Sequence, residues 1–261
     1  MPLSRRSSGN TWSHYWKNDP SMDSLYELTQ RIGYFQVDQH HSIRLSSLFQ
    51  LFQEAAIHHA NQWEIGTSIM EDKGESWILN RVAMQLDRYP RLDETVTIQT
   101  WAPRLTQFKG FREFRIVVGG ETIGRISTLW LYINIEKKAF SKIPFEIEQA
   151  FPVRPDDIYF ESLDRLRLPK PKSNSLATSI SLRYTDIDGN HHVNNAAYMD
   201  MIQTALHHQN LDTRPRTVEI QFAREISPDA ESVTVQLESA DEKTIFGIGT
   251  AEEVAAFGRL A

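Results

Sequence analysis

The densest group of polar side chains in the sequence lies between residues 185 and 195, where Asp188, Asn190 and His192 are spaced two residues apart. Apolar residues at helical spacing follow, so this group occupies a turn that leads into a helix. The first turn of a helix exposes free N–H groups and the positive end of the helix dipole, which can polarise a carbonyl or hold an oxyanion. Carboxylate, amide and imidazole groups placed there offer a base, a donor and a proton shuttle. This turn is therefore the candidate catalytic site.

The same residues also have a purely structural interpretation. Asp and Asn are preferred helix caps, and His192 can be an ordinary surface histidine. A similar turn 150 residues earlier provides a control, because it keeps the Asp but has His40 in place of Asn190 and Ser42 in place of His192. Capping alone does not require this asymmetry, which favours a chemical role for the second turn.

The two turns belong to a longer internal repeat. Residues 37–60 match residues 187–210 with five identities in 24 positions. Further along, Met84–Leu86 matches Ile220–Phe222 at an offset of 136, and Glu94–Gln99 matches Glu231–Gln236 at an offset of 137. The matching segments occur in the same order, so the chain contains two diverged copies of one unit.

Each copy has the same predicted secondary structure. Apolar residues at helical spacing follow Ser46–Ser47 in the first copy and Asn194–Asn195 in the second, which predicts one amphipathic helix in each. Runs rich in β-branched and aromatic residues predict the strands 77–86, 95–101, 111–118 and 126–135, then 217–222, 232–237, 244–248 and 254–260. An antiparallel sheet that wraps one long helix is the hotdog fold, so the predicted class is α+β, a tandem double hotdog.

Proline marks the boundary between the copies. Four of the 11 prolines lie within residues 152–171, and proline fixes φ and cannot donate to a β ladder. We therefore predict an N-terminal tail over 1–24, an N-terminal hotdog domain over 25–150, an extended linker over 151–173 and a C-terminal hotdog domain over 174–261 that carries the catalytic turn. The linker offers four basic residues to an acidic partner: Arg165, Arg167, Lys170 and Lys172.

Composition argues against several classes of function. The chain has 28 basic and 34 acidic residues, a net charge of −6, which disfavours nucleic-acid binding. It has no cysteine, which excludes disulfides, thiolate zinc sites and a cysteine nucleophile. Eight of the nine histidines form adjacent pairs that point to different faces, so no metal is expected. The longest apolar run is too short for a membrane helix and no secretory signal is evident, so a cytoplasmic location is expected.

The segment from Asp188 to Asn195, followed by Tyr198, resembles the D-x-N-x-H-V-N-N-x-x-Y signature of acyl-carrier-protein thioesterases, the double-hotdog enzymes that end fatty-acid synthesis. The Gln53–Ala56 and Trp130–Asn134 segments resemble the same family, and the resemblance covers about residues 25–261. It implies that Asp188, Asn190, His192 and Glu225 are the catalytic residues. Ile226 occupies the position of a cysteine once proposed as the nucleophile, which leaves a carboxylate mechanism.

Thioester hydrolysis needs an activated water, donors for the oxyanion and a proton for the leaving sulfur. We assign Asp188 as the base or electrostatic partner of the water, with direct attack by Asp188 to form an anhydride as the alternative. His192, oriented by Glu225, is the expected proton shuttle. The expected oxyanion donors are Asn190 and the backbone N–H groups near Val193, Asn194 and Asn195.

The expected activity is hydrolysis of fatty acyl thioesters of acyl carrier protein, with coenzyme A thioesters as further substrates and no metal or organic cofactor. Two other functions stay open: a hotdog acyl-thioester dehydratase, and a non-catalytic acyl-binding or lipid-sensing module. The family resemblance implies that the first hotdog houses the acyl tail, with Trp63, Trp77 and Trp130 as its candidate lining. The sequence leaves open the preferred acyl length and the choice between monomer and homodimer.

Overall fold

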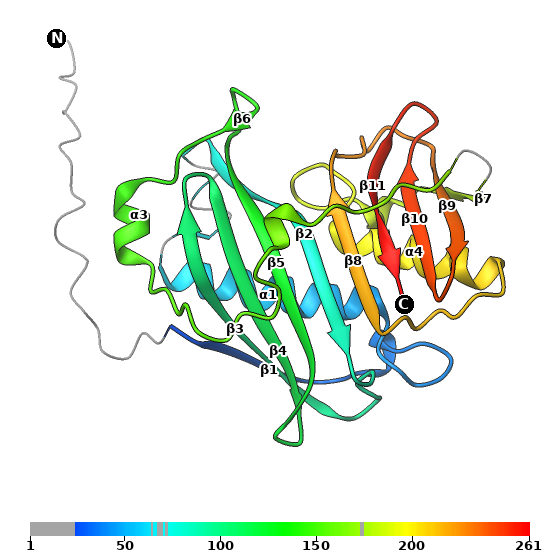
Figure 1. Ribbon diagram of the computed structural model, residues 1–261, viewed down its shortest axis with the longest axis horizontal. Helices are drawn as coiled ribbons and strands as arrows, with labels where there is room; N and C mark the ends of the chain where they lie inside the picture. Colours follow the sequence, from blue (N-terminus) through cyan, green and yellow to red (C-terminus); the bar gives the residue numbers. More distant parts are fainter. Residues whose placement is uncertain (1–23, 64, 67–69, 71–72, 173–174) are drawn as a thin grey trace, which may run out of the picture.

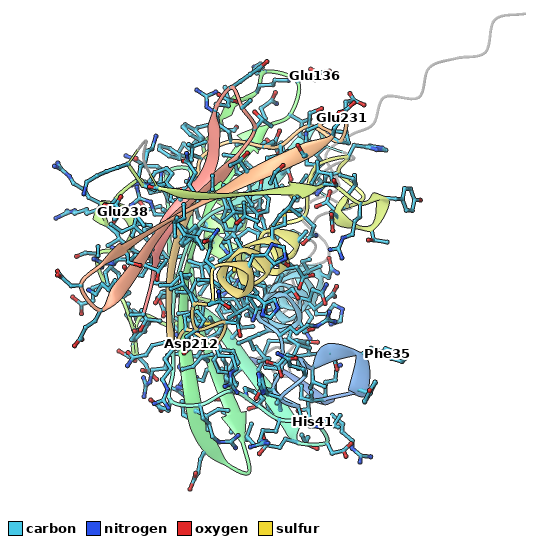
Figure 2. All side chains as sticks on the ribbon, turned by 90° about the vertical axis from the view of Figure 1, so that its right-hand side faces the viewer. Phe35, His41, Glu136, Asp212, Glu231 and Glu238 are labelled. Atoms are coloured by element: carbon cyan, nitrogen blue, oxygen red, sulfur yellow. The ribbon has the colours of Figure 1, made fainter. Side chains whose placement is uncertain are left out.

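The computed structural model describes residues 24–261 except 64, 67–69, 71–72 and 173–174. Within these residues, one antiparallel sheet of eleven strands packs against two long helices, α1 (Leu45–Gln62) and α4 (Asn195–His208) (Figure 1). The side view in Figure 2 shows both helices on the same side of the twisted sheet. The predicted α+β class is confirmed. No helix in the described part of the chain has the length and apolar character needed to span a bilayer.

The first half of the chain contributes six strands to the sheet and the second half five, and ten of the eleven form one continuous path. Their order is β1-β3-β4-β5-β2 in the first half and β8-β11-β10-β9-β7 in the second, and all eight predicted strands are present. The bounds are Tyr26–Arg31 for β1, Glu75–Leu86 for β2, Thr95–Thr106 for β3, Lys109–Val118 for β4, Glu121–Asn134 for β5, Leu176–Ser181 for β7, Thr217–Phe222 for β8, Ser232–Ala240 for β9, Lys243–Gly249 for β10 and Val254–Leu260 for β11. The sequence analysis did not locate the first strand of either half, β1 or β7. It also did not locate β6 (Ala139–Phe140), which pairs with β5, or the short helix α3 (Phe145–Ala150).

The two halves join where β2 pairs with β8 in antiparallel fashion, and at the centre of that pairing Ala83 lies opposite Glu219. These two residues are also equivalent in the repeat, since 83 plus the offset of 136 is 219. A residue that pairs with its own repeat equivalent lies on a twofold axis. The tandem copies are therefore related by a pseudo-twofold axis through this junction, as two subunits of a symmetric dimer would be.

One continuous core lies between the sheet and the helices. Alternate residues of each strand face the helices, among them Val96 and Ile98 of β3 and Val233 and Val235 of β9. The helices contact each other along the core, and the N–H of Leu45 at the start of α1 donates to the α4 side chain of Gln203 at 3.0 Å. The two copies are therefore joined twice, by the β2–β8 pairing within the sheet and by the contact between the helices on one face of it.

The segment between the halves crosses the outer face of the sheet (Figure 1). Apart from one 3₁₀ turn, Leu163–Arg165, it has no helix or strand between α3 and β7 in the described residues. Its Leu163 is buried against Phe111 and Leu129, which alternate with the core-facing residues of β4 and β5. This segment thus covers the first half of the sheet on the face that points away from α1.

Candidate functional site

The polar turn is built on a closed loop between Ile187 and Val193, which form an isolated antiparallel bridge. Asp188 organises this loop: its N–H donates to the His192 carbonyl at 3.0 Å, and its Oδ1 accepts the N–H of Asn190 at 2.9 Å. His191 at the tip has a φ of 60°, the left-handed conformation that such tight turns need. The loop therefore projects Asn190 and His192 from a fixed base.

The first copy builds the same loop without the same chemistry. Asp38 accepts the N–H groups of His40 and Ser42 at 2.8 and 3.0 Å, and His41 has a φ of 57°. The structural role of the aspartate is therefore common to both copies. What distinguishes the second copy is the set of side chains that the loop presents, together with a contact of 3.4 Å from Asn194 Nδ2 to Asp188 Oδ2.

The start of α4 provides one backbone donor to the site. Asn194 is the N-cap, and its Oδ1 accepts the N–H of Ala196 at 2.8 Å. The N–H groups of Val193 and Asn194, expected to be oxyanion donors, already donate to the carbonyls of Ile226 and Asp186 at 3.4 and 2.8 Å. Within the described residues the N–H of Asn195 has no backbone acceptor, because it opens the helix. Of the three predicted N–H groups, that of Asn195 remains for a ligand.

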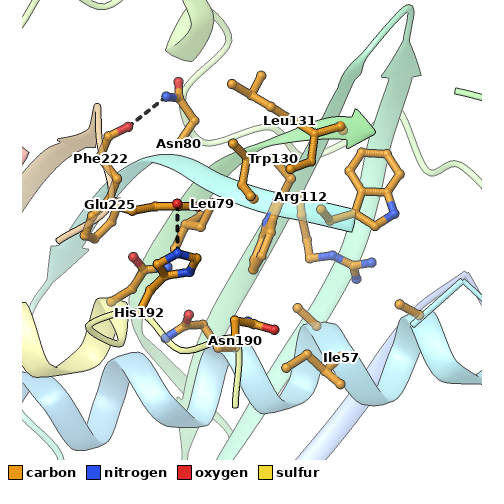
Figure 3. Close-up of a pocket in the computed structure, with 18 of the residues that line it drawn as sticks. Ile57, Leu79, Asn80, Arg112, Trp130, Leu131, Asn190, His192, Phe222 and Glu225 are labelled. Carbon is orange, nitrogen blue, oxygen red and sulfur yellow. Dashed lines mark hydrogen bonds and ion pairs between the residues drawn. The ribbon is translucent and has the colours of Figure 1, made fainter. Parts of the chain in front are cut away.

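His192 and Glu225 come together as the family resemblance implies. His192 Nε2 lies 3.0 Å from Glu225 Oε2, and the two side chains are 39% and 61% exposed (Figure 3). At this exposure an ion pair contributes about 0–1 kcal/mol to stability. The contact therefore serves to orient the imidazole rather than to hold the fold together.

A side chain from the first half supports the loop that carries Glu225. Asn80 donates through Nδ2 to the carbonyl of Phe222, the last residue of β8, at 2.9 Å (Figure 3). Asn80 sits at a register shift of β2 between Leu79 and Arg81, and such bulges re-aim a side chain. Sequence reasoning missed Asn80, although an amide inside an otherwise apolar strand is a signal that could have found it.

The turn opens into a cleft of about 1490 Å³ whose walls come from both halves. Figure 3 shows Asn190, His192 and Glu225 on one side of it, Arg112 on the other and Trp130 between them. The main lining residues of the first half are Gln53, Ala56, Ile57, Trp77, Leu79, Asn80, Gly110, Phe111, Arg112, Trp130 and Leu131, and those of the second are Asp188, Asn190, His192, Val193, Asn194, Asn195, Tyr198, Phe222 and Glu225.

The three tryptophans predicted to line the acyl-binding space do not share one environment. Trp77 and Trp130 line the cleft, and Trp130 is anchored by a hydrogen bond from Nε1 to Thr128 Oγ1 at 2.9 Å. Trp63, which follows α1, does not line the cleft but packs edge-on against Phe151, which does, with ring centroids 6.0 Å apart. Trp63 thus lies behind the cleft wall, and its contact with substrate stays a prediction.

The site has the groups for acid–base chemistry on a carbonyl compound. In the described residues, no three His, Asp or Glu side chains gather in a way that could hold a metal ion. Tyr198, buried beneath the turn, packs against Phe222, and burial with the nearby Glu225 charge raises its pKa, so its hydroxyl stays protonated. A carboxylate, an amide, an imidazole and a helix N-terminus therefore converge at the mouth of a largely apolar cleft.

Two protein-family models match this chain. Residues 23–151 match the acyl-ACP thioesterase N-terminal domain, and residues 169–254 match the acyl-ACP thioesterase C-terminal domain. A palmitoyl-acyl carrier protein thioesterase of Cuphea hookeriana is 24% identical over 221 residues, 79% of this chain and 52% of that protein. A dodecanoyl-[acyl-carrier-protein] hydrolase of Cinnamomum camphora is 27% identical over 191 residues, 68% of this chain and 50% of that protein. The chain thus spans about half the length of these curated relatives.

Solved structures show the same double-hotdog fold. An acyl-ACP thioesterase from Bacteroides thetaiotaomicron superposes with a TM-score of 0.79 at 20% identity, covering 91% of this chain and 97% of that one. The 12:0-ACP thioesterase from Umbellularia californica gives the same TM-score and identity, covering 91% and 96%. The predicted tandem double hotdog is confirmed by this likeness. With both domain models matched in order along most of its length, the chain belongs to the acyl-ACP thioesterase family.

Proposed function

We propose that this protein hydrolyses fatty acyl thioesters of acyl carrier protein to free fatty acid and the carrier thiol, with coenzyme A thioesters as further substrates. The observation that carries this proposal is the single cleft that joins the polar turn of the second half to the apolar interior of the first. A thioester carbonyl at the turn would place its acyl chain in that interior. Family membership supports the same reaction.

Hydrolysis at this turn needs one water molecule. Asp188 polarises the water or accepts its proton as the water oxygen bonds to the carbonyl carbon. Asn190 and the N–H of Asn195 stabilise the resulting oxyanion, a role that preorganised donors fill at low cost. The carbon–sulfur bond then breaks, and His192, held by Glu225 at 3.0 Å, supplies the proton to the leaving sulfur. The products are the carboxylic acid and the free thiol, and the proton released by the water restores His192 for the next turnover.

An acidic carrier would meet positive charge at the mouth of the cleft. Lys138, which is exposed, and Arg224 both line it, although Arg224 also pairs with Glu253 at 2.9 Å. The basic linker is less available than its sequence suggests, because Lys172 pairs with Glu238 at 2.7 Å and Lys170 lies over the Phe257 ring. We therefore place the carrier near Lys138 in preference to the linker.

The test is a hydrolysis assay over carrier-bound acyl chains of graded length, with variants of the turn. Replacing Asp188, Asn190 or His192 singly by Ala should lower kcat by roughly 10² or more while the fold is retained. Ser42→Ala in the equivalent loop of the first copy is the matched control and should remain near wild type, since Ser42 contributes its backbone to that loop.

Product analysis decides between the reactions that the fold can support. A free thiol and a fatty acid support hydrolysis. Formation of an enoyl thioester would instead make the protein a dehydratase. Binding of acyl chains with no turnover on any carrier would make it an acyl-binding module, and full activity in Asp188→Ala would exclude the mechanism above.

A further inference from the structure

The far wall of the cleft contains a buried positive charge. Arg112 of β4 is only 8% exposed, and its Nη1 donates to His59 Nδ1 at 2.9 Å and lies 3.4 Å from Thr100 Oγ1. Burial lowers the pKa of Arg112 to about 10, so the guanidinium remains charged at neutral pH. A buried charged group thus lies in the wall of the cleft, on the side away from the polar turn.

Among the described residues, no carboxylate balances this charge. In the part of the chain that the structure describes, no Asp or Glu lies within ion-pair distance of Arg112. Buried arginines are normally paired, because removing a cation from water is costly. The recorded hydrogen bonds of Arg112 use Nη1 alone, whereas a guanidinium has five N–H donors. The guanidinium also lies over the Phe151 ring, with Cζ 5.6 Å from the ring centroid, and because Arg112 lines the cleft we expect its remaining donors to serve a molecule bound there.

The second copy shows that the fold itself does not need a positive charge at this place. The strand registers make Arg112 of β4 equivalent to Thr244 of β10, which carries no charge. Thr100 and Thr128, beside Arg112, are equivalent to Leu237 and Leu260, which are buried in the core. The buried charge is therefore confined to the half whose interior lines the cleft.

The sheet order gives the lateral distance between Arg112 and the strand that leads to Glu225. Arg112 is in register with Ile220 of β8 across three strand spacings of about 4.8 Å each, so the two positions lie about 14 Å apart across the sheet. An extended alkyl chain with C–C bonds of about 1.5 Å advances about 1.3 Å per carbon. A chain of about ten or eleven carbons would therefore cover this lateral distance.

We propose that Arg112 forms a distal subsite that recognises an oxygen atom, a hydroxyl or oxo group, at the far end of an acyl chain of about ten carbons. The spare N–H groups donate to that oxygen. A plain chain of the same length places a methyl group against the charge and gains less. This inference rests on the proposed function only in that the acyl chain occupies the cleft with its carbonyl end at the turn.

Calorimetric binding of non-hydrolysable pantetheine amides, in which NH replaces the thioester sulfur, tests the subsite. Free fatty acids are unsuitable because their own carboxylate could bind Arg112. The chains are decanoyl, 10-hydroxydecanoyl and 5-hydroxydecanoyl. The wild type should bind the 10-hydroxydecanoyl amide at least about tenfold more tightly than the 5-hydroxydecanoyl amide. This is the difference in affinity expected from one charge-assisted hydrogen bond. Equal affinities for the two hydroxylated chains overturn the proposal without any variant.

Variants then assign the preference to Arg112. Arg112→Met should remove the advantage of the terminal hydroxyl, and Arg112→Lys should retain part of it. Arg115→Met is the matched control, because Arg115 lies on the same strand but contacts Asp157 and Trp101 away from the cleft. An unchanged preference in Arg112→Met overturns the proposal. Because binding is measured without turnover, the two proposals can fail separately. If the protein hydrolyses acyl thioesters but shows no preference for the terminal hydroxyl, only the subsite is rejected. If it shows the preference but hydrolyses no thioester, only the proposed function is rejected.

Discussion

A buried carboxyl group on the outer face of the sheet makes the stability of this protein depend on pH. Glu113 of β4 is 3% exposed beneath the segment that links the two halves. Its Oε2 accepts a hydrogen bond from Ser127 Oγ at 2.6 Å and one from the N–H of Tyr159 at 3.3 Å. Burial outweighs these bonds and raises the pKa of Glu113 from 4.5 to about 7. The folded protein therefore keeps this carboxyl group protonated over a range where the unfolded chain ionises it.

The sign and size of the effect follow from this difference. Because the folded-state pKa is the higher one, the stabilising contribution of Glu113 is fully present below pH 4.5 and is lost as the pH rises through about 7. Each pKa unit corresponds to about 1.36 kcal/mol, so the full difference is about 3 kcal/mol. Between pH 5 and pH 8 the expected loss is about 2.5 kcal/mol, since part of the titration lies below pH 5.

Urea unfolding of the wild type and Glu113→Gln at several pH values between 5 and 8 measures this loss. Glutamine retains an acceptor for Ser127 and Tyr159 but does not ionise. The free energy of unfolding of the wild type should fall relative to Glu113→Gln by about 2 to 3 kcal/mol across the range. Glu242→Gln, at an exposed turn between β9 and β10, is the control and should parallel the wild type. Parallel curves for the wild type and Glu113→Gln would refute the argument.

Three further predictions concern the cleft. Asn80→Ala should lower kcat about tenfold with little change in KM, because the substitution removes the hydrogen bond that holds the end of β8 leading to Glu225. Asn80→Gln should restore part of the activity, and equal changes in kcat and KM would contradict a positioning role. Tryptophan emission should shift as the bound acyl chain lengthens, because each added methylene group contributes about 0.8 kcal/mol to binding in the cleft. Trp130→Phe should remove most of this emission shift, and an unchanged shift in that variant would place the acyl chain elsewhere. Lys138→Glu should raise KM for carrier-bound substrates in a salt-dependent way and leave small thioesters unaffected; equal effects on both substrates would exclude carrier contact there.

Local sequence patterns predict both long helices, eight of the strands and the duplication of the unit. Helix starts at Ser46–Ser47 and Asn194–Asn195, the eight strands after the helices and the equivalence of the two polar turns are all local patterns, set by caps, periodicity and turn residues. The α+β class follows from these patterns, and so does the order of the two units. The chemical difference between the turns was also readable, because it resides in side-chain identity at Asn190 and His192.

The contacts that those elements make with one another cannot be read from local patterns. Asn80 and Phe222 are 142 residues apart in the chain, and their contact exists because β2 pairs with β8 and carries a bulge at that point. The sequence could not show that Arg112 faces the cleft while Glu113, its neighbour, faces the linker, because strand alternation gives two faces without saying what covers each one. Burial depends on contacts between segments distant in sequence, and burial determines which charged side chains are solvated and which become sites.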